Sequence, residues 1–141
     1  MTAAQLNKNK TEVVLTTLNS RYIHSSFSLR YLFANLGELQ TATELVEFTI
    51  HDRPIDMVEK LLARQPAIIG FSVYIWNVVE TTAVIQLLKT VRPDIVVVLG
   101  GPEVSHLPDQ PDVVEDVDYV IKGPGETSFK RLCEQVLQGQ A

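Results

Sequence analysis

The chain has 141 residues, of which 45% are hydrophobic and 21% charged, a balance typical of one folded domain and unlike that of a disordered or low-complexity segment. Lys and Arg number 12 against 17 Asp and Glu, for a net charge of −5, and no basic stripe forms, so a nucleic-acid partner is not expected. The single cysteine, Cys133, excludes an intramolecular disulfide and any multi-cysteine metal or iron–sulfur site built by this chain alone.

The ends of the chain and its apolar runs indicate the extent of the domain and its location in the cell. Residues 1–10 are polar and predict a loose tail, whereas residues 11–141 are predicted to form one domain. The sequence contains no apolar secretory signal and no run of about 18 apolar residues, so we expect no membrane partner and a cytoplasmic location. The helical pattern simply fades at the end of the sequence, so the domain is either free-standing or a piece of a longer protein.

Short runs of β-branched residues alternate with helical periodicity, which predicts an α/β fold with a parallel sheet. Strands are predicted over Glu12–Leu18, Leu45–Ile50, Ile68–Val73, Ile95–Leu99 and Tyr119–Ile121. The third and fourth runs are continuously apolar and, with the first, are expected at the sheet centre, whereas the alternating second run and the short fifth run are expected at the edges. This pattern favours a flavodoxin-like (Rossmann-like), doubly wound sheet of order 2-1-3-4-5 between two helical layers.

Two helices are predicted before the third strand. The first runs from about Ser26 to Leu36 and ends at Gly37, with Ser25 or Ser26 as its N-cap. In the second, Asp56 and Lys60 lie four residues apart, a spacing that favours an ion pair on the helix surface. The apolar stripe of this second helix consists of Ile55, Val58, Leu61 and Leu62.

Two more helices are predicted after the third and fifth strands. Asn77 and Glu80 form a capping-box pattern that predicts the start of a helix, and Pro93 ends it. The apolar stripe of this helix consists of Val84, Leu87, Leu88 and Val91. The apolar face of the last helix consists of Phe129, Leu132, Cys133, Val136 and Leu137. Cys133 is therefore expected to be a core residue and not a nucleophile.

A doubly wound sheet binds ligands in the loops at the carboxyl ends of its strands. After the first strand, residues 19–26 are rich in polar side chains and lead into a helix N-terminus, which suits an anion or a polar tail, although the segment could equally serve only to cap and anchor that helix. After the third strand, Tyr74, Ile75 and Trp76 predict an apolar surface. This surface could contact a flat cofactor or another domain, or the three side chains could simply pack on one another beside the helix cap.

Glycine-rich turns follow the fourth and fifth strands. Gly100 and Gly101 follow the fourth strand, and Gly123 and Gly125 follow the fifth. Glycine lets a ligand approach the main chain closely, although tight turns alone account for these residues equally well. Together the two turns predict a narrow and neutral slot at one edge of the sheet.

Several motifs for phosphate binding and catalysis are absent from the sequence. There is no G-x-x-x-x-G-K-[ST] loop, no G-x-G-x-x-G after the first strand and no G-x-S-x-G elbow, so NTPase, dinucleotide-binding and α/β-hydrolase functions are not favoured. A receiver domain requires acidic residues where Asn19 and Ser72 stand, so phospho-acceptor signalling is not favoured either.

Read together, the loops resemble the cobalamin-binding domain that lies ahead of the catalytic barrel in radical S-adenosylmethionine enzymes. The segments that carry the resemblance are LNSRYIHSSFSLRYL (18–32), GFSVYIWN (70–77), VLGGPEV (98–104) and YVIKGPGE (119–126). The resemblance implies a corrin ring across the carboxyl edge of the sheet and a nucleotide tail in the slot between the last three loops. The cofactor-binding residues that it implies are Asn19, Ser20, Arg21, Tyr22, Ile23, His24, Ser72, Val73, Tyr74, Ile75, Trp76, Gly100, Gly101, Pro102, Glu103, Val104, Gly123, Gly125 and Glu126.

The resemblance also implies what the chain lacks. No D-x-H-x-x-G segment surrounds His24, so no cobalt-ligating histidine is predicted. In the family, a C-x-x-x-C-x-x-C motif of the barrel holds a [4Fe–4S] cluster that binds S-adenosylmethionine, and one cysteine cannot supply that motif. The chain is therefore not expected to be catalytic alone. It is expected to be the N-terminal module of a longer methyltransferase or oxidoreductase, with the barrel of the same polypeptide as its partner.

Two alternatives stay open from the residues. A flavodoxin-like electron carrier would stack Tyr74 or Trp76 on FMN and hold the phosphate at Ser20, Ser25 and Ser26, but the Ser/Thr-Gly phosphate loop of such carriers is missing. A pure interaction domain would dock its partner on Tyr74, Ile75 and Trp76 and leave the crevice empty.

Overall fold

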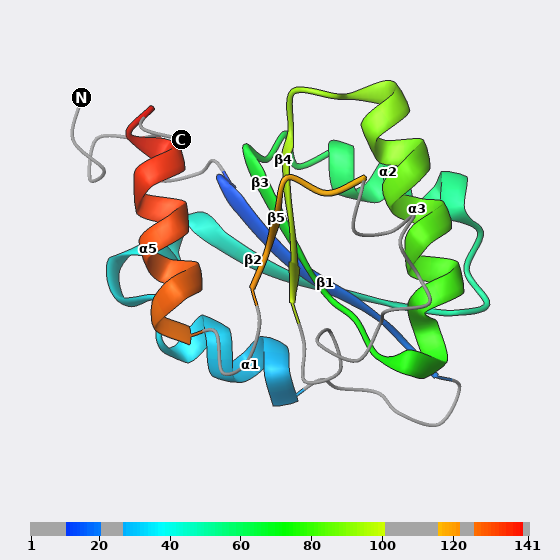
Figure 1. Cartoon of the computed structure of the whole chain (residues 1–141), viewed down its shortest axis with the longest axis horizontal. Coiled ribbons are helices and arrows are strands. Elements are labelled where there is room, and N and C mark those ends of the chain that lie inside the picture. Colours follow the sequence, from blue (N-terminus) through cyan, green and yellow to red (C-terminus); the bar gives the residue numbers. More distant parts are fainter. Residues whose placement is uncertain (1–10, 21–26, 101–115, 122–125, 140–141) are drawn as a thin grey trace.

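Five parallel strands form one sheet in the order β2-β1-β3-β4-β5 (Figure 1). The computed structural model describes residues 11–20, 27–100, 116–121 and 126–139. The strands are β1 (Val13–Asn19), β2 (Thr43–Thr49), β3 (Ile68–Ser72), β4 (Val96–Gly100) and β5 (Tyr119–Val120). The predicted fold class and strand order are confirmed, with β2 and β5 at the edges.

The winding direction of the sheet reverses between β1 and β3. From β1 the chain passes to β2 on one side, and from β3 it passes to β4 and β5 on the other. β1 pairs with β2 along all of its 7 residues, but with β3 only through Val13–Thr16, opposite Ile68–Phe71. The pairing of the two central strands therefore ends before their carboxyl ends, at the position where doubly wound sheets bind ligands.

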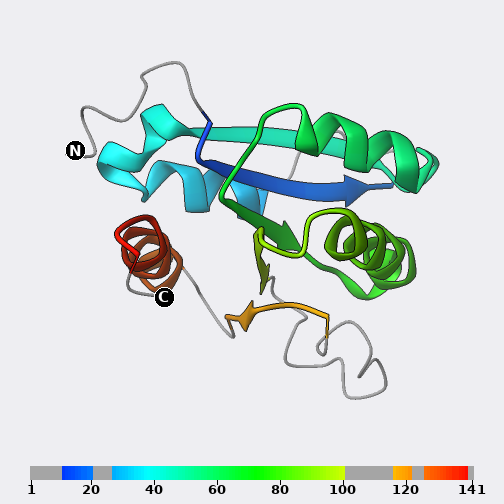
Figure 2. The same cartoon turned by 90° about the horizontal axis from the view of Figure 1, so that it is seen from above.

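Helices cover both faces of the sheet (Figures 1 and 2). Helices α1 (Phe27–Ala34) and α5 (Glu126–Leu137) pack on one face, and α2 (Pro54–Leu62) and α3 (Val78–Val91) pack on the other. Two short 3-10 helices complete the fold: η1 (Gly37–Ala42) precedes β2, and η2 (Ile75–Asn77) leads from β3 into α3. Within the described ranges, no helix is long and apolar enough to cross a membrane.

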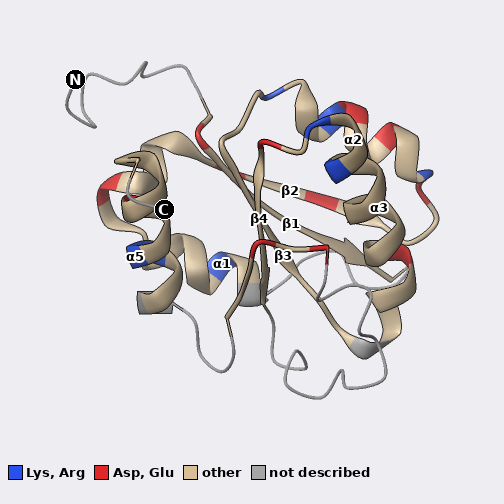
Figure 3. Ribbon diagram, turned by 45° about the horizontal axis from the view of Figure 1, so that its top comes forward, with Lys and Arg blue, Asp and Glu red and all other residues tan. Residues whose placement is uncertain are grey.

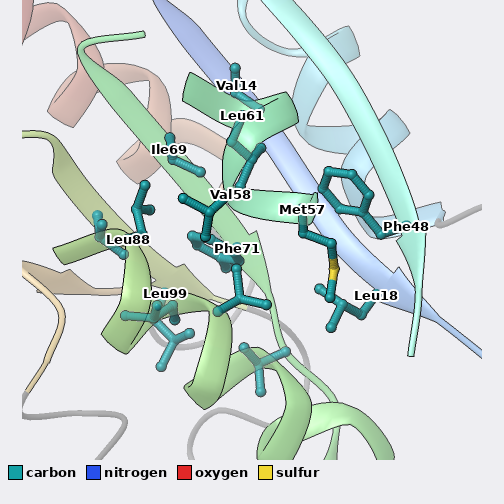
Figure 4. Close-up of a cluster of buried hydrophobic side chains, with 14 of the residues drawn as sticks. Val14, Leu18, Phe48, Met57, Val58, Leu61, Ile69, Phe71, Leu88 and Leu99 are labelled. Atoms are coloured by element: carbon teal, nitrogen blue, oxygen red, sulfur yellow. The ribbon is translucent and has the colours of Figure 1, made fainter. Parts of the chain in front are cut away.

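The hydrophobic cluster between the sheet and the α2–α3 layer is shown in Figure 4. Its labelled members are Val14, Leu18, Phe48, Met57, Val58, Leu61, Ile69, Phe71, Leu88 and Leu99. Full burial of a side chain of this kind contributes about 1.5–3 kcal/mol. Strands β1, β3 and β4 also supply residues to the cluster on the opposite face, which explains why their runs of apolar residues are nearly unbroken.

Helix α5 packs closely on the other face of the sheet. A Cβ atom at Gly70 would lie 3.1 Å from Leu15 Cδ2 and 3.1 Å from the Phe129 ring, so a larger residue at this position of β3 requires those side chains to shift. Cys133 is fully buried in the same cluster, which confirms its predicted place in the core. Burial, and secondarily the Glu134 carboxylate, raise the pKa of the Cys133 thiol to about 12.

Some details of helices α2 and α3 differ from the sequence predictions. Asp56 pairs with Arg53, whose Nε lies 2.9 Å from Asp56 Oδ2, and not with Lys60, because the Arg53 guanidinium at the helix start makes two hydrogen bonds to the carboxylate. Ile55 and Val91 are 45% and 50% exposed, so their predicted places in the apolar stripes are wrong. The buried residues of these helices are instead Met57, Val58, Leu61, Val78, Thr81, Val84, Ile85 and Leu88.

The first predicted helix is confirmed with a shorter span. Helix α1 ends at Ala34, and the amides of Asn35 and Leu36 make tighter i to i−3 bonds of 3.2 and 3.1 Å to Leu32 and Phe33. Gly37 follows with a φ of +59°, the left-handed conformation that glycine adopts easily after a helix. The predicted N-caps, Ser25 and Ser26, lie outside the described residues.

Charged residues of both signs are spread over the described helices, loops and strand β2 (Figure 3). One network fixes the edge strand β5, which has only 2 residues. Lys89 Nζ of α3 lies 2.9 Å from Asp118 Oδ2, and the same oxygen accepts a hydrogen bond of 2.8 Å from the Val97 amide of β4. The side chain of Asp118 thus adds a bond to the short ladder between β4 and β5.

Candidate cofactor-binding site

The carboxyl ends of the central strands bring three of the predicted site residues to one edge of the sheet: Asn19 ends β1, Ser72 ends β3 and Gly100 ends β4. Ser72 is in register with Gly100, and the Val73 amide donates a hydrogen bond of 2.8 Å to the Gly100 carbonyl. The ends of these strands therefore lie at one edge of the sheet, while the convergence of the loops that follow them stays a prediction.

Ser72 carries a buried hydroxyl that the described part of the chain does not use. The residue is 3% exposed, and its Oγ has no hydrogen-bond partner there. Its backbone carbonyl, in contrast, accepts a bond of 2.7 Å from Thr17 Oγ1. A buried hydroxyl without a partner costs about 1–3 kcal/mol, so this atom is a candidate for contact with a ligand that donates or accepts a hydrogen bond.

The turn after β3, residues 74–77, is called the aromatic turn below. The Tyr74 and Trp76 rings are stacked, with centroids 5.3 Å apart and an interplanar angle of 11°. Trp76 is 40% exposed and Tyr74 is half-buried. A stacked pair with one open ring offers apolar surface to a large flat ligand. The Val73 side chain differs, because it is fully buried in the cluster between the sheet and the α2–α3 layer, and only its amide is bonded at the edge.

Gly100 leaves open space at the end of β4. A Cβ atom added there would meet only the Ile121 carbonyl oxygen, at 3.8 Å, which is an ordinary contact. Packing within the described chain therefore does not require glycine at this position, in contrast to Gly70. Among the described residues, nothing else fills the space above this backbone, which suits the close approach of a ligand.

Asn19 is occupied by contacts with its neighbours. It is 4% exposed, and its Nδ2 lies 3.4 Å from Glu47 Oε1 of β2. Glu47 Oε2 in turn lies 3.2 Å from Arg30 Nη2 of α1. The Asn19 carbonyl accepts a bond of 2.9 Å from the Ile50 amide, and Ser20 is half-buried. This corner of the site is thus fixed by β2 and α1.

Asn77 does not act as the predicted helix cap. Its Oδ1 accepts a hydrogen bond of 2.8 Å from the Tyr74 amide, and its Nδ2 donates one of 2.9 Å to the Leu18 carbonyl and lies 3.5 Å from Thr17 Oγ1. The capping pattern was misleading because the side chain turns toward β1 and not toward the amides of α3, with which it makes no capping bond. The role of Thr17 in the site was not predicted. The sequence signal that could have found it is a polar residue near the end of a strand that is expected in the core.

The side chains of the remaining predicted site residues are not described. Two of these residues have a described backbone: Ile75 starts η2 and Glu126 starts α5. The predicted residues that lie outside the described ranges are Arg21, Tyr22, Ile23, His24, Gly101, Pro102, Glu103, Val104, Gly123 and Gly125.

Comparison with known proteins gives one family match. A family described as the B12 binding domain matches residues 13–133. The chain is 34% identical over 84 residues to 2-(S-pantetheinyl)-carbapenam-3-carboxylate methyltransferase of Streptantibioticus cattleyicolor, which covers 55% of this chain and 12% of the relative. It is 35% identical over 72 residues to the cobalamin-dependent radical SAM methyltransferase TokK of Streptomyces tokunonensis, covering 48% of this chain and 10% of that protein.

A solved structure supports the same assignment at the level of the fold. The structure of the cobalamin-dependent S-adenosylmethionine radical enzyme OxsB with aqua-cobalamin bound superimposes with a TM-score of 0.71 and 20% identity, over 95% of this chain and 20% of OxsB. The chain thus spans about a tenth to a fifth of the length of these proteins. Because the family match extends over most of the chain, the chain belongs to the family of B12-binding domains.

Proposed function

We propose that this chain is a cobalamin-binding module that holds the corrin ring across the carboxyl edge of the sheet. The observation that carries the proposal is the buried Ser72 hydroxyl in a member of the B12-binding family. Among the described residues this hydroxyl has no hydrogen-bond partner, and nothing covers the neighbouring backbone of Gly100 closely. The edge lies at the reversal between β1 and β3, where a crevice is expected in a doubly wound sheet.

The described residues fit the parts of cobalamin. The Ser72 hydroxyl suits a polar atom of the nucleotide tail, and the space at Gly100 lets the planar base of the tail approach the main chain. The exposed Trp76 ring and its stacked neighbour Tyr74 suit the apolar border of a corrin. When bound, cobalamin supplies a cobalt centre for group transfer or electron transfer, while the residues of this chain bind and orient it.

Residues outside the described ranges, together with Glu126 at the start of α5, complete the proposed site. The segment from Arg21 to His24 is assigned to the face of the corrin next to β1 and α1. The segment from Gly101 to Val104 and the turn that contains Gly123, Gly125 and Glu126 are assigned to the walls around the nucleotide tail. These assignments rest on the resemblance to the family and on the place of each segment in the chain.

The parent protein is proposed to be a longer radical S-adenosylmethionine enzyme, a methyltransferase or oxidoreductase of the cytoplasm. The named relatives are cobalamin-dependent radical enzymes or methyltransferases that are much longer than this chain. In such a protein the [4Fe–4S] cluster and S-adenosylmethionine belong to the barrel. The test is the gene itself: codons downstream of Ala141 that encode C-x-x-x-C-x-x-C support the proposal, and an authentic stop codon after Ala141 contradicts it.

Titration of the purified chain with hydroxocobalamin tests the cofactor. We expect a saturable change in the visible absorption spectrum with one cobalamin bound per chain, and no saturable response to FMN in a parallel titration. The FMN titration separates this function from that of a flavodoxin-like carrier. The absence of saturable cobalamin binding, or binding of FMN in its place, would remove the proposal.

A further inference from the structure

The aromatic turn is held against β1 by side chains and not by the sheet ladder. We propose that Thr17 and Asn77 form a buried hydrogen-bond clasp that positions residues 72–76 for the cofactor, so that both are positioning residues. The effect of the clasp on cofactor affinity rests on the proposed function, whereas its effect on the conformation of the turn does not.

The need for a clasp follows from the strand pairing. β1 and β3 are paired only as far as Thr16 and Phe71, whereas β1 continues beside β2 to Asn19 and β3 continues beside β4 to Ser72. Past Thr16, no ladder between β1 and β3 remains to fix how far apart the two strand ends lie. Carbonyl groups that face this gap need other donors if they are buried.

Two side chains supply those donors. Thr17 Oγ1 donates a hydrogen bond of 2.7 Å to the Ser72 carbonyl, across 55 positions of sequence. Asn77 Nδ2 donates one of 2.9 Å to the Leu18 carbonyl, across 59 positions. Both side chains are completely buried, so water does not compete with either bond.

Asn77 also closes the aromatic turn on itself. The Tyr74 amide donates to Asn77 Oδ1 at 2.8 Å, and the Asn77 amide donates to the Tyr74 carbonyl at 3.0 Å. The amide side chain therefore binds the turn with its oxygen and β1 with its nitrogen. Among side chains of this size, only the neutral amide of asparagine offers both an acceptor and a permanent donor. A carboxylate lacks the donor, and leucine supplies neither a donor nor an acceptor.

The position of the clasp relates it to the cofactor. It holds the Ser72 backbone, which carries the unpartnered Oγ, and the turn that carries the stacked Tyr74 and Trp76 rings. Groups that are ordered before binding spare the ligand the entropy of ordering them. Loss of the clasp is thus expected to lower cobalamin affinity without removal of any group that touches the cofactor.

The sharpest test is the Asn77→Asp variant, read by fluorescence. Trp76 is the only tryptophan of the chain, so its emission reports on the aromatic turn directly. A protonated Asp at position 77 retains both functions, since its carbonyl accepts and its hydroxyl donates, and ionisation removes the donor. Burial raises the pKa of such a carboxyl above its usual value of about 4. We expect native emission from the apo variant at about pH 5 and altered emission as the carboxyl ionises, while wild-type emission stays constant.

The matched control is Asn35→Asp. Asn35 Nδ2 makes the same kind of bond, 2.8 Å to the Tyr31 carbonyl, but it is exposed, directly after the end of α1. The titratable residues closest to position 77 in the chain, Tyr74 and Glu80, are unchanged in both variants, so the wild-type titration accounts for them. The Asn35 variant is expected to show wild-type emission at every pH. If Asn77→Asp fails to fold, the pair Thr17→Val and Thr17→Ser takes its place, and only the valine variant is expected to alter Trp76 emission.

Binding measured on the same variants distinguishes failure of the clasp from failure of the proposed function. Relative to wild type at the same pH, hydroxocobalamin affinity of Asn77→Asp is expected to fall about tenfold once the carboxyl is ionised, and to recover on protonation. If Trp76 emission of Asn77→Asp changes with protonation of the carboxyl but the protein binds no cobalamin, the clasp is supported and the proposed function is contradicted. Wild-type emission and affinity of folded Asn77→Asp across the pH range, or wild-type behaviour of Thr17→Val, overturns the clasp.

Discussion

At the amino end of the sheet, main-chain hydrogen bonds join β1 to both of its neighbours, whereas at the carboxyl end side chains join β1 to β3. The Glu12 amide donates to the Ala42 carbonyl at 2.8 Å, and the Glu12 carbonyl accepts bonds of 2.9 and 3.1 Å from Ala67 and Ile68. At the carboxyl end, the ends of β1 and β3 are joined by the side chains of Thr17 and Asn77. The same end holds the Ser72 hydroxyl, which has no hydrogen-bond partner among the described residues.

This difference separates two tasks along one sheet. A main-chain ladder tolerates many side chains and supplies stability, while an end completed by specific side chains depends on their identity and leaves polar groups for a ligand. Substitutions near the amino end and in the core are therefore expected to change the free energy of unfolding. Substitutions at the carboxyl end are expected to change cofactor affinity.

The largest effect on stability is expected at the amino end. Ile68 is fully buried at the start of β3, so Ile68→Ala removes packing and leaves a cavity, at a cost of about 2–5 kcal/mol in the free energy of unfolding. Urea denaturation measures the loss. Cobalamin affinity, measured on folded protein at low temperature, should stay at the wild-type value, and a parallel loss of affinity would show that the two ends are not separable.

Gly70 in the core and Gly100 at the carboxyl end of β4 give a matched pair of substitutions. Gly70→Ala places a Cβ 3.1 Å from Leu15 and Phe129, and this overpacking is expected to cost about 1–3 kcal/mol of stability. Gly100→Ala meets no described atom closer than 3.8 Å, so stability should be unchanged, while cobalamin affinity should fall because the methyl group fills the space at the site. Thermal melts and cofactor titrations of both variants measure the two effects. The reverse assignment, with Gly100→Ala unstable and Gly70→Ala poor in binding, would contradict the account.

Ser72→Ala is expected to have effects of opposite sign on stability and binding. Removal of a buried hydroxyl that has no partner among the described residues should raise the free energy of unfolding of the apo protein by about 1 kcal/mol. The same change should weaken cobalamin binding several-fold, since the hydroxyl is proposed to contact the nucleotide tail. Chemical denaturation measures the change in stability, and titration with cobalamin measures the change in affinity. A destabilised apo protein would show that the hydroxyl already has a structural partner.

The smallest effect near neutral pH concerns Cys133. Its thiol pKa is about 12 in the folded chain against an ordinary value of 9.0, so folding favours the protonated form. The contribution to stability is complete below about pH 9 and is lost as the pH rises toward about 12, because only the unfolded thiol ionises in that interval. Iodoacetamide at about pH 8 should modify the urea-unfolded chain and leave the native chain untouched. Rapid modification of the native protein would place Cys133 outside the core.

Most of the fold could be predicted from the sequence because its signals are local. Unbroken apolar runs placed β3 and β4 at the centre of the sheet, and the alternation in β2 and the shortness of β5 placed them at the edges. The aromatic turn was predicted for the same reason, since Tyr74 and Trp76 follow directly on a buried strand.

The contacts that could not be predicted are those made over long sequence distances. Asn77 with Glu80 has the spacing of a capping box, but the partners of Asn77 on β1 lie 59 and 60 positions earlier in the chain. The ion pair of Asp56 was assigned by helical spacing, yet Arg53, just before the helix, reaches the carboxylate. Val91 fits a helical stripe but lies in the last turn of α3 and is half-exposed. Local spacing shows which neighbouring residues are able to form a contact, but the tertiary fold determines which contacts are formed.

The most direct test of the central claim is a map of the backbone amides that respond to hydroxocobalamin. Its Co(III) centre is diamagnetic, so ¹H–¹⁵N spectra of the labelled chain can be followed through a titration. The account predicts that the largest shifts fall on Ser72, Tyr74, Trp76 and Gly100, and that Glu12, Ala67 and Ile68 at the other end of the sheet stay unchanged. Shifts confined to the amino end, or no shifts at saturating cobalamin, would contradict the assignment of the carboxyl edge as the cobalamin site.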